Sequence, residues 1–144
     1  MNLLTETQRR RLRANAAQPD LDHRPVVKFF NPLGAARWLF TELGEDGDIL
    51  FGLNDHGFGF PELGYCSLAD IAGTRLPWGL RIERDPHFRA KAPLSVYAEA
   101  ARHAARIVEH GPEFDAALSR HEAARHVAGR ERNRAPSLSP QAGR

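Results

Sequence analysis

Three acidic residues come closest to a reactive set in this sequence. Asp55, Glu62 and Asp85 all fall in turns or at the ends of expected strands. If strand ends gather these carboxylates, their oxygens suit Mg²⁺ or Mn²⁺. His56 and His87 stand beside two of these acids and are candidates for a metal ligand or a general base. The pattern raises one enzymatic hypothesis, a metal-dependent hydrolase or nuclease.

Ordinary turn chemistry is the competing interpretation of the same acids. Asp55 precedes a His-Gly pair and suits an Asx turn, in which its carboxylate accepts a backbone N–H. Asp85 stands before a proline, which is likewise typical of a turn. Closeness in sequence is not evidence that side chains converge in space. We therefore favour the turn interpretation, under which no metal or other cofactor is expected.

The remaining reactive residue types lack the spacing that catalysis requires. His121 and His126 are five residues apart, which on a helix places them roughly 140° apart and off a common zinc-binding face. Cys66 is the single cysteine and is expected to be buried and inert. Ser67 lacks a G-x-S-x-G elbow and is expected to cap a helix. The glycine-rich residues 57–64 do not form a phosphate loop, because an acid replaces the basic residue.

Positive charge is concentrated at the two ends of the chain. The net charge is only +2, and no lysine or arginine lies between Arg37 and Arg75, where acids accumulate. Basic ends contact nucleic acid or an acidic protein partner, and phosphate contacts do not read base sequence. Solvated helix faces are the competing interpretation. The candidate phosphate contacts are Arg9, Arg10, Arg11, Arg13, Arg130, Arg132 and Arg134.

Phe58 and Phe60 are two residues apart in the acidic middle of the chain. Exposed aromatic side chains at such a spacing form a platform on which bases stack. The lack of nearby basic residues removes the electrostatic part of a nucleic-acid site. We therefore expect both phenylalanines to turn inward and pack in the core.

Length and composition indicate one ordinary domain. The 144 residues are 42% hydrophobic, enough for a substantial core. No apolar run approaches the roughly eighteen residues of a membrane helix, and residues 1–16 lack the apolar segment of a secretory signal. We therefore expect a cytoplasmic protein without membrane contact. Its oligomeric state is left open.

Capping residues, prolines and glycines divide the chain into elements. Thr5 and Gln8 have capping-box spacing, which predicts a helix over residues 5–16. β-branched and aromatic runs bounded by turn residues indicate strands. The strands are expected over residues 25–32, 34–43, 49–55 and 80–85, with an Asp-Gly hairpin turn at 44–48. Residues 34–43 also fit a helix by spacing, and the hairpin turn that follows them favours the strand.

Further helices are predicted after residue 66. Ser67 caps a short one, and Ser95 caps the clearest one, which ends at Gly111. Pro112 starts a weaker helix. These elements predict an α+β fold: an antiparallel meander of about four strands packed by one long helix, with an N-terminal helix. The predicted units are a compact domain over residues 1–110, a helical extension over 111–128 and a disordered basic tail over 129–144.

Several short motifs in a fixed order resemble a known family. They are L-T-x-x-Q, P-V-V-K-F-F-N-P, W-L-F-T-E-L, F-G-L-N-D-H-G, P-E-L-G-Y-C-S-L and E-R-D-P-H-F, over residues 4–108. This order resembles the bacterial domain of unknown function 2958. The resemblance implies a compact α+β domain, often encoded on plasmids and other mobile genetic elements. It implies no catalytic residue. We therefore expect a non-enzymatic accessory protein that binds a protein or nucleic-acid partner.

Overall fold

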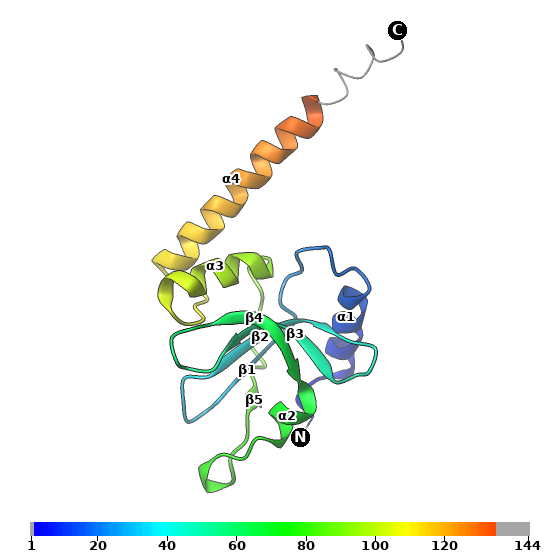
Figure 1. Cartoon of the computed structure of the whole chain (residues 1–144), viewed down its shortest axis with the longest axis vertical. Helices are drawn as coiled ribbons and strands as arrows, with labels where there is room; N and C mark the ends of the chain where they lie inside the picture. Colours follow the sequence, from blue (N-terminus) through cyan, green and yellow to red (C-terminus); the bar gives the residue numbers. More distant parts are fainter. Residues whose placement is uncertain (1, 135–144) are drawn as a thin grey trace.

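The computed structural model describes residues 2–134 and shows a sheet with helices on both sides (Figure 1). Within these residues, five antiparallel strands lie in the order β4-β3-β2-β1-β5. The strands are β1 (Val27–Phe30), β2 (Arg37–Leu43), β3 (Ile49–Asp55), β4 (Glu62–Ser67) and β5 (Glu83–Arg84). The helices are α1 (Glu6–Ala16), α2 (Leu68–Gly73), the 3-10 turn η1 (Pro77–Gly79), α3 (Leu94–Ala104) and α4 (Pro112–Arg134). The predicted α+β fold with an antiparallel meander is confirmed.

The sheet separates two hydrophobic cores, because side chains alternate between its faces along each strand. On one face, Phe29 and Phe40 pack edge to face, with ring centroids 5.7 Å apart, and share a core with Leu12 of α1. On the other face, Leu39 and Leu53 share a core with α3 and the first turns of α4. The face on which a strand residue lies therefore decides which helices it meets.

β4 is the strand that the sequence patterns did not predict. Its six residues include Gly64, which pairs with Gly52 of β3. A Cβ atom on Gly52 would lie 2.0 Å from the carbonyl oxygen of Leu39, whereas a Cβ atom on Gly64 would meet nothing closer than 3.9 Å. Only the first glycine is required by close packing. Glycines are rare in strands, so this segment looked like a loop.

The predicted local capping signals are confirmed. Thr5 and Gln8 form a reciprocal capping box at the start of α1. In the β2–β3 turn, Asp46 Oδ1 accepts the N–H groups two and three residues further on, at 2.9 and 3.1 Å. Ser67 Oγ accepts the N–H of Asp70 at 3.2 Å and caps α2. Each of these bonds joins residues within three positions, which a sequence pattern can record.

α3 begins and ends at signals different from those predicted. Its N-cap is Pro93, which makes no side-chain capping bond, and the N–H of Ser95 instead donates to Asp22 Oδ1 at 3.1 Å. The helix stops where Ala105 adopts a left-handed backbone with φ of 60°. The predicted cap at Ser95 and the predicted end at Gly111 are therefore wrong. An alanine rarely adopts this conformation, so the sequence carries no sign of it.

α4 begins at Pro112, as predicted. Phe114 and Ala117 are buried against α3, and the later turns extend away from the sheet (Figure 1). Residues 129–134 are helical, not disordered as predicted. The rest of the predicted tail, 135–144, lies outside the described residues. Among those described, no helix combines the length and apolar character needed to cross a bilayer.

Candidate functional site

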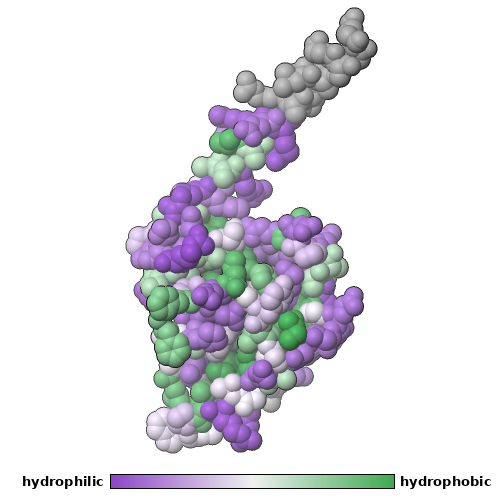
Figure 2. All heavy atoms as spheres, viewed as in Figure 1, coloured by the Kyte–Doolittle hydropathy of each residue, from purple (hydrophilic) through white to green (hydrophobic). Residues whose placement is uncertain are grey.

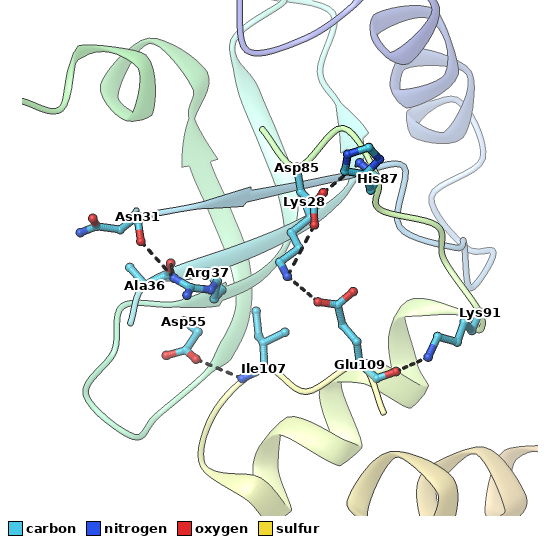
Figure 3. A network of polar contacts seen from close by, with 10 residues as sticks. All are labelled: Lys28, Asn31, Ala36, Arg37, Asp55, Asp85, His87, Lys91, Ile107 and Glu109. Carbon is cyan, nitrogen blue, oxygen red and sulfur yellow. Dashed lines mark hydrogen bonds and ion pairs between the residues drawn. The ribbon is translucent and has the colours of Figure 1, made fainter. Parts of the chain in front are cut away.

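Asp55, at the end of β3, joins two distant parts of the chain. The residue is 2% exposed. Its Oδ1 accepts the N–H of Gly57 at 2.9 Å, which is the predicted Asx turn. Its Oδ2 accepts the N–H of Ile107 at 3.0 Å, which ties the α3–α4 connection to β3 (Figure 3). Both carboxylate oxygens are thus occupied by backbone donors.

The three acidic candidates are not brought together. Glu62 pairs with Asn54, so its side chain lies on the sheet face opposite that of Asp55. Asp85 follows β5, at the other end of the strand order. Within residues 2–134, no three His, Cys, Asp or Glu side chains are placed to hold a metal ion. The metal-dependent hydrolase hypothesis gains no support from the described residues.

Lys28 is at the centre of a polar network between β1 and the helices (Figure 3). Its Nζ lies 3.9 Å from Asp85 Oδ2 and donates to Glu109 Oε2. Asp85 Oδ1 accepts the backbone N–H of His87 at 2.9 Å. Lys91 Nζ donates to the carbonyl oxygen of Glu109 at 2.6 Å. This network fastens the α3–α4 connection to β1 and uses only the backbone of the histidine.

The loop between β3 and β4 presents aromatic side chains to solvent. Phe58 is 82% exposed and Phe60 is 78% exposed, so the prediction that both turn into the core is wrong. Two glycines of the loop have φ of 88° and 89°, which favour a turn that leaves the sheet. Figure 2 shows hydrophobic residues, in green, on the left rim of the molecule, where Figure 1 shows this loop. His56 is also exposed, with its ring edge-on to Trp38 and centroids 6.2 Å apart.

β4 forms an open edge of the sheet. Among the described strands it pairs only with β3. The N–H of Leu68 donates to the carbonyl of Asp48 at 2.8 Å, and bonded and non-bonded pairs alternate along an antiparallel ladder. The N–H and C=O groups of Leu63 and Tyr65 therefore point away from β3. Sequence reasoning missed both residues, although their spacing of two is typical of a strand.

Side chains also mark this edge. Tyr65 is 75% exposed, and its ring lies 5.0 Å from that of Phe51 on the neighbouring strand. Leu63, two residues earlier on the same face, is half exposed. Contiguous exposed apolar side chains are uncommon on proteins that have no partner there. The edge and the β3–β4 loop together expose four large apolar side chains: Phe58, Phe60, Leu63 and Tyr65.

Two hollows flank β4, one on each face of the sheet. The α3-side hollow, of about 340 Å³, is lined by Leu63 and by charges of both signs, among them the ion pair in which Arg120 Nε lies 3.0 Å from Glu99 Oε1. The α2-side hollow, of about 400 Å³, has an acidic lining that includes Glu62 and Asp70. Leu63 lines both hollows.

Cys66 and Ser67 show no sign of nucleophilic activation. Burial raises the pKa of the Cys66 thiol, and nearby Asp70 raises it further. A neutral thiol is a poor nucleophile, which supports the prediction of an inert cysteine, although Cys66 is half-buried and not fully buried as predicted. Ser67 Oγ donates to Asp48 Oδ2 at 2.7 Å while it caps α2. Its hydroxyl is therefore already committed to the fold.

The candidate phosphate contacts are divided between two helices on different faces of the sheet. α1 shares the core of one face, and α4 packs on α3 over the other. Arg13 Nη2 donates to the carbonyl of Glu45 at 3.5 Å and helps to hold the β2–β3 turn. The α1 members are Arg9, Arg10, Arg11 and Arg13, and the α4 members are Arg130, Arg132 and Arg134.

Comparison with known proteins places the chain in a family. The family described as Protein of unknown function (DUF2958) matches residues 3–108. No curated protein and no solved structure matches the chain. The matched residues contain the whole sheet, α1 and α3, while α4 lies beyond them. Since the match covers more than half of the sequence, the chain belongs to this family of unknown function, DUF2958.

Proposed function

We propose that this protein is a non-enzymatic interaction protein that receives an extended segment of a protein partner along β4. The observation that carries the proposal is the open edge of β4, which lies between two hollows and beside exposed aromatic side chains. An accessory role on a bacterial plasmid or other mobile element, implied by the family resemblance, belongs to the same proposal.

Strand addition accounts for the geometry of this edge. A partner strand would pair with the outward N–H and C=O groups of Leu63 and Tyr65 and extend the sheet by one strand. Successive side chains of a strand point to opposite faces. Consecutive partner residues would therefore reach the α3-side hollow and the α2-side hollow in turn. Backbone pairing would supply affinity, and the two hollows would select side chains.

The chemistry of the surface defines the partner. Exposed rings of Phe58, Phe60 and Tyr65 would leave water on binding, which is worth about 25 cal/mol for each Å² of apolar surface. Glu62 and Asp70 make the α2-side hollow acidic. We therefore expect an extended partner segment with apolar residues and at least one basic residue. A phosphate backbone would be repelled by these acids, which disfavours nucleic acid at this edge.

Peptides selected from a random display library test the proposal. Their dissociation constants would be measured by fluorescence anisotropy against the parent protein, Leu63→Pro and Leu63→Ala. Proline at position 63 removes an outward N–H and leaves the hydrogen bonds to β3 intact. We therefore expect peptide binding at least about tenfold weaker than in the parent. This factor corresponds to about 1.4 kcal/mol of binding free energy. Leu63→Ala retains that N–H and should weaken binding less.

The selected sequences supply a second readout. The selected peptides should be enriched in lysine or arginine and in apolar residues. Phe60→Ala should weaken the binding of these peptides. The matched control is Leu21→Ala, which removes another exposed apolar side chain away from β4. Selected peptides that bind Leu63→Pro and the parent equally well would contradict strand addition at β4.

A further inference from the structure

A separate cavity lies at the end of the sheet opposite β4. Residues of α1, of the segment before β1 and of the segment after β5 enclose about 280 Å³. Each of these three segments contributes an arginine to the lining: Arg11, Arg24 and Arg89. All three residues are exposed. They are far apart in the sequence, so only the fold brings them to one cavity, which we call the arginine cavity.

The positive charge of the arginine cavity is not balanced from within. The one acidic residue in its lining is Asp85, whose carboxylate accepts the N–H of His87 and lies 3.9 Å from Lys28 Nζ. Within residues 2–134, none of the three arginines forms an ion pair. Three like charges around one cavity repel one another, and an anion between them would relieve that repulsion.

Two of the three arginines are held in place while keeping free donors. Arg24 Nη1 donates to the carbonyl of Ala90 at 3.3 Å, and Arg89 Nη1 donates to the carbonyl of Phe88 at 3.0 Å. A guanidinium group has five N–H donors, so one such bond leaves the others for a ligand. Gln8 also lines the cavity. Its Oε1 accepts the N–H of Thr5, so its amide NH₂ is the part left to donate.

We propose that the arginine cavity binds a phosphate group. Guanidinium groups match the oxygens of phosphate in paired hydrogen bonds, which a simple monoanion such as chloride does not accept. The cavity is near the small end of the range for ligand sites, which suits a phosphate with a small attached group. A free phosphate ester and the backbone of a nucleic acid share this chemistry. The site is independent of β4, so the two proposals succeed or fail separately.

Isothermal titration calorimetry at fixed ionic strength tests the site with three probes. They are inorganic phosphate, adenosine monophosphate and a single-stranded oligonucleotide, each titrated into the full chain. We expect saturable binding of at least one probe. Binding of the small probes alone identifies a phosphate ester as the ligand, and oligonucleotide binding that falls steeply with salt identifies a nucleic-acid backbone. No saturable binding of any probe would overturn the proposal.

Charge-matched variants locate the binding. Arg24→Gln combined with Arg89→Gln should weaken binding at least about tenfold, because charge-assisted hydrogen bonds are lost. Arg24 and Arg89 also hold the neighbouring loop, so a second variant is needed. The side chain of Arg11 makes no hydrogen bond within the described residues, and Arg11→Gln should weaken binding several-fold. Arg75→Gln combined with Arg125→Gln removes equal charge at exposed positions outside the cavity and should change nothing. Equal losses in that control would show nonspecific attraction and overturn the site.

Discussion

The two edge strands of the sheet differ in length and in what surrounds them. At the β5 end, the outer strand has two residues, and the Lys28 network and three arginines surround it. Short strands and charges of this kind prevent unwanted pairing. At the β4 end, a six-residue strand presents the exposed side chains of Leu63 and Tyr65 on an edge that no described strand pairs with. The difference fits the proposal that the β4 edge receives a partner, whereas the β5 edge is protected.

The largest effect is expected at Gly52 of β3, where the backbone of β2 passes closest. Gly52→Ala would place a Cβ atom 2.0 Å from the backbone oxygen of Leu39, so we expect a loss of about 4 kcal/mol or more in the free energy of unfolding. Gly64→Ala, directly opposite, meets nothing closer than 3.9 Å and should cost less than about 1 kcal/mol. Urea denaturation followed by circular dichroism measures both. Equal effects would show that close packing does not require glycine at this pair.

Asp55→Ala should have the next largest effect. It leaves the buried N–H of Ile107 and the part-buried N–H of Gly57 without their acceptor, which we expect to cost about 3 kcal/mol. Hydrogen exchange at Ile107 should accelerate more than the global loss of stability explains. Glu62→Ala, in an exposed position, is the control and should change stability by less than about 0.5 kcal/mol. Similar losses in the two variants would contradict the anchoring role.

A smaller effect is expected at the protected end. Lys28→Met removes the ammonium group that pairs with both Asp85 and Glu109. These groups are partly exposed, so we expect a loss of about 1–2 kcal/mol after solvent screening. Combining it with Asp85→Asn and Glu109→Gln should restore part of that loss. Thermal denaturation of the single and triple variants measures these changes in stability. A triple variant that is less stable than Lys28→Met alone would contradict the network.

The smallest effect on stability is expected at the most exposed aromatic residues. Phe58→Ser combined with Phe60→Ser removes side chains that are 82% and 78% exposed, so the free energy of unfolding should change by less than about 0.5 kcal/mol. Peptide binding at β4 should nevertheless weaken, since these rings lie beside the edge. A large loss of stability would mean that the rings pack in the fold and are not reserved for a partner.

Local features were predictable from the sequence, and distant contacts were not. The capping box of Thr5 and the turn at Asp46 depend on residues within three positions, so residue spacing predicts them. The bond from Asp22 to the start of α3 spans 73 positions and left no pattern. The left-handed Ala105, which ends the same helix, also had no sequence signal.

The candidate surface illustrates the same limit. A spacing of two between Phe58 and Phe60 fits an inward-facing strand as well as a loop. The outcome depends on the path of the β3–β4 loop, in which Gly57 and Gly59 have φ of 88° and 89°. The acidic character of the region was readable in advance, because it needs only composition. The open edge of β4 could not be predicted in the same way, because it depends on the order of the strands in the sheet.

Amide hydrogen exchange on β4, with and without a selected peptide, tests the proposed strand addition most directly. In the free protein, the amides of Leu63 and Tyr65 should exchange rapidly because they point outward, whereas those of Gly64 and Cys66 should be protected by β3. At saturating peptide, we expect Leu63 and Tyr65 to become protected as well. If these two amides still exchange as rapidly in the complex as in the free protein, no strand has been added to β4.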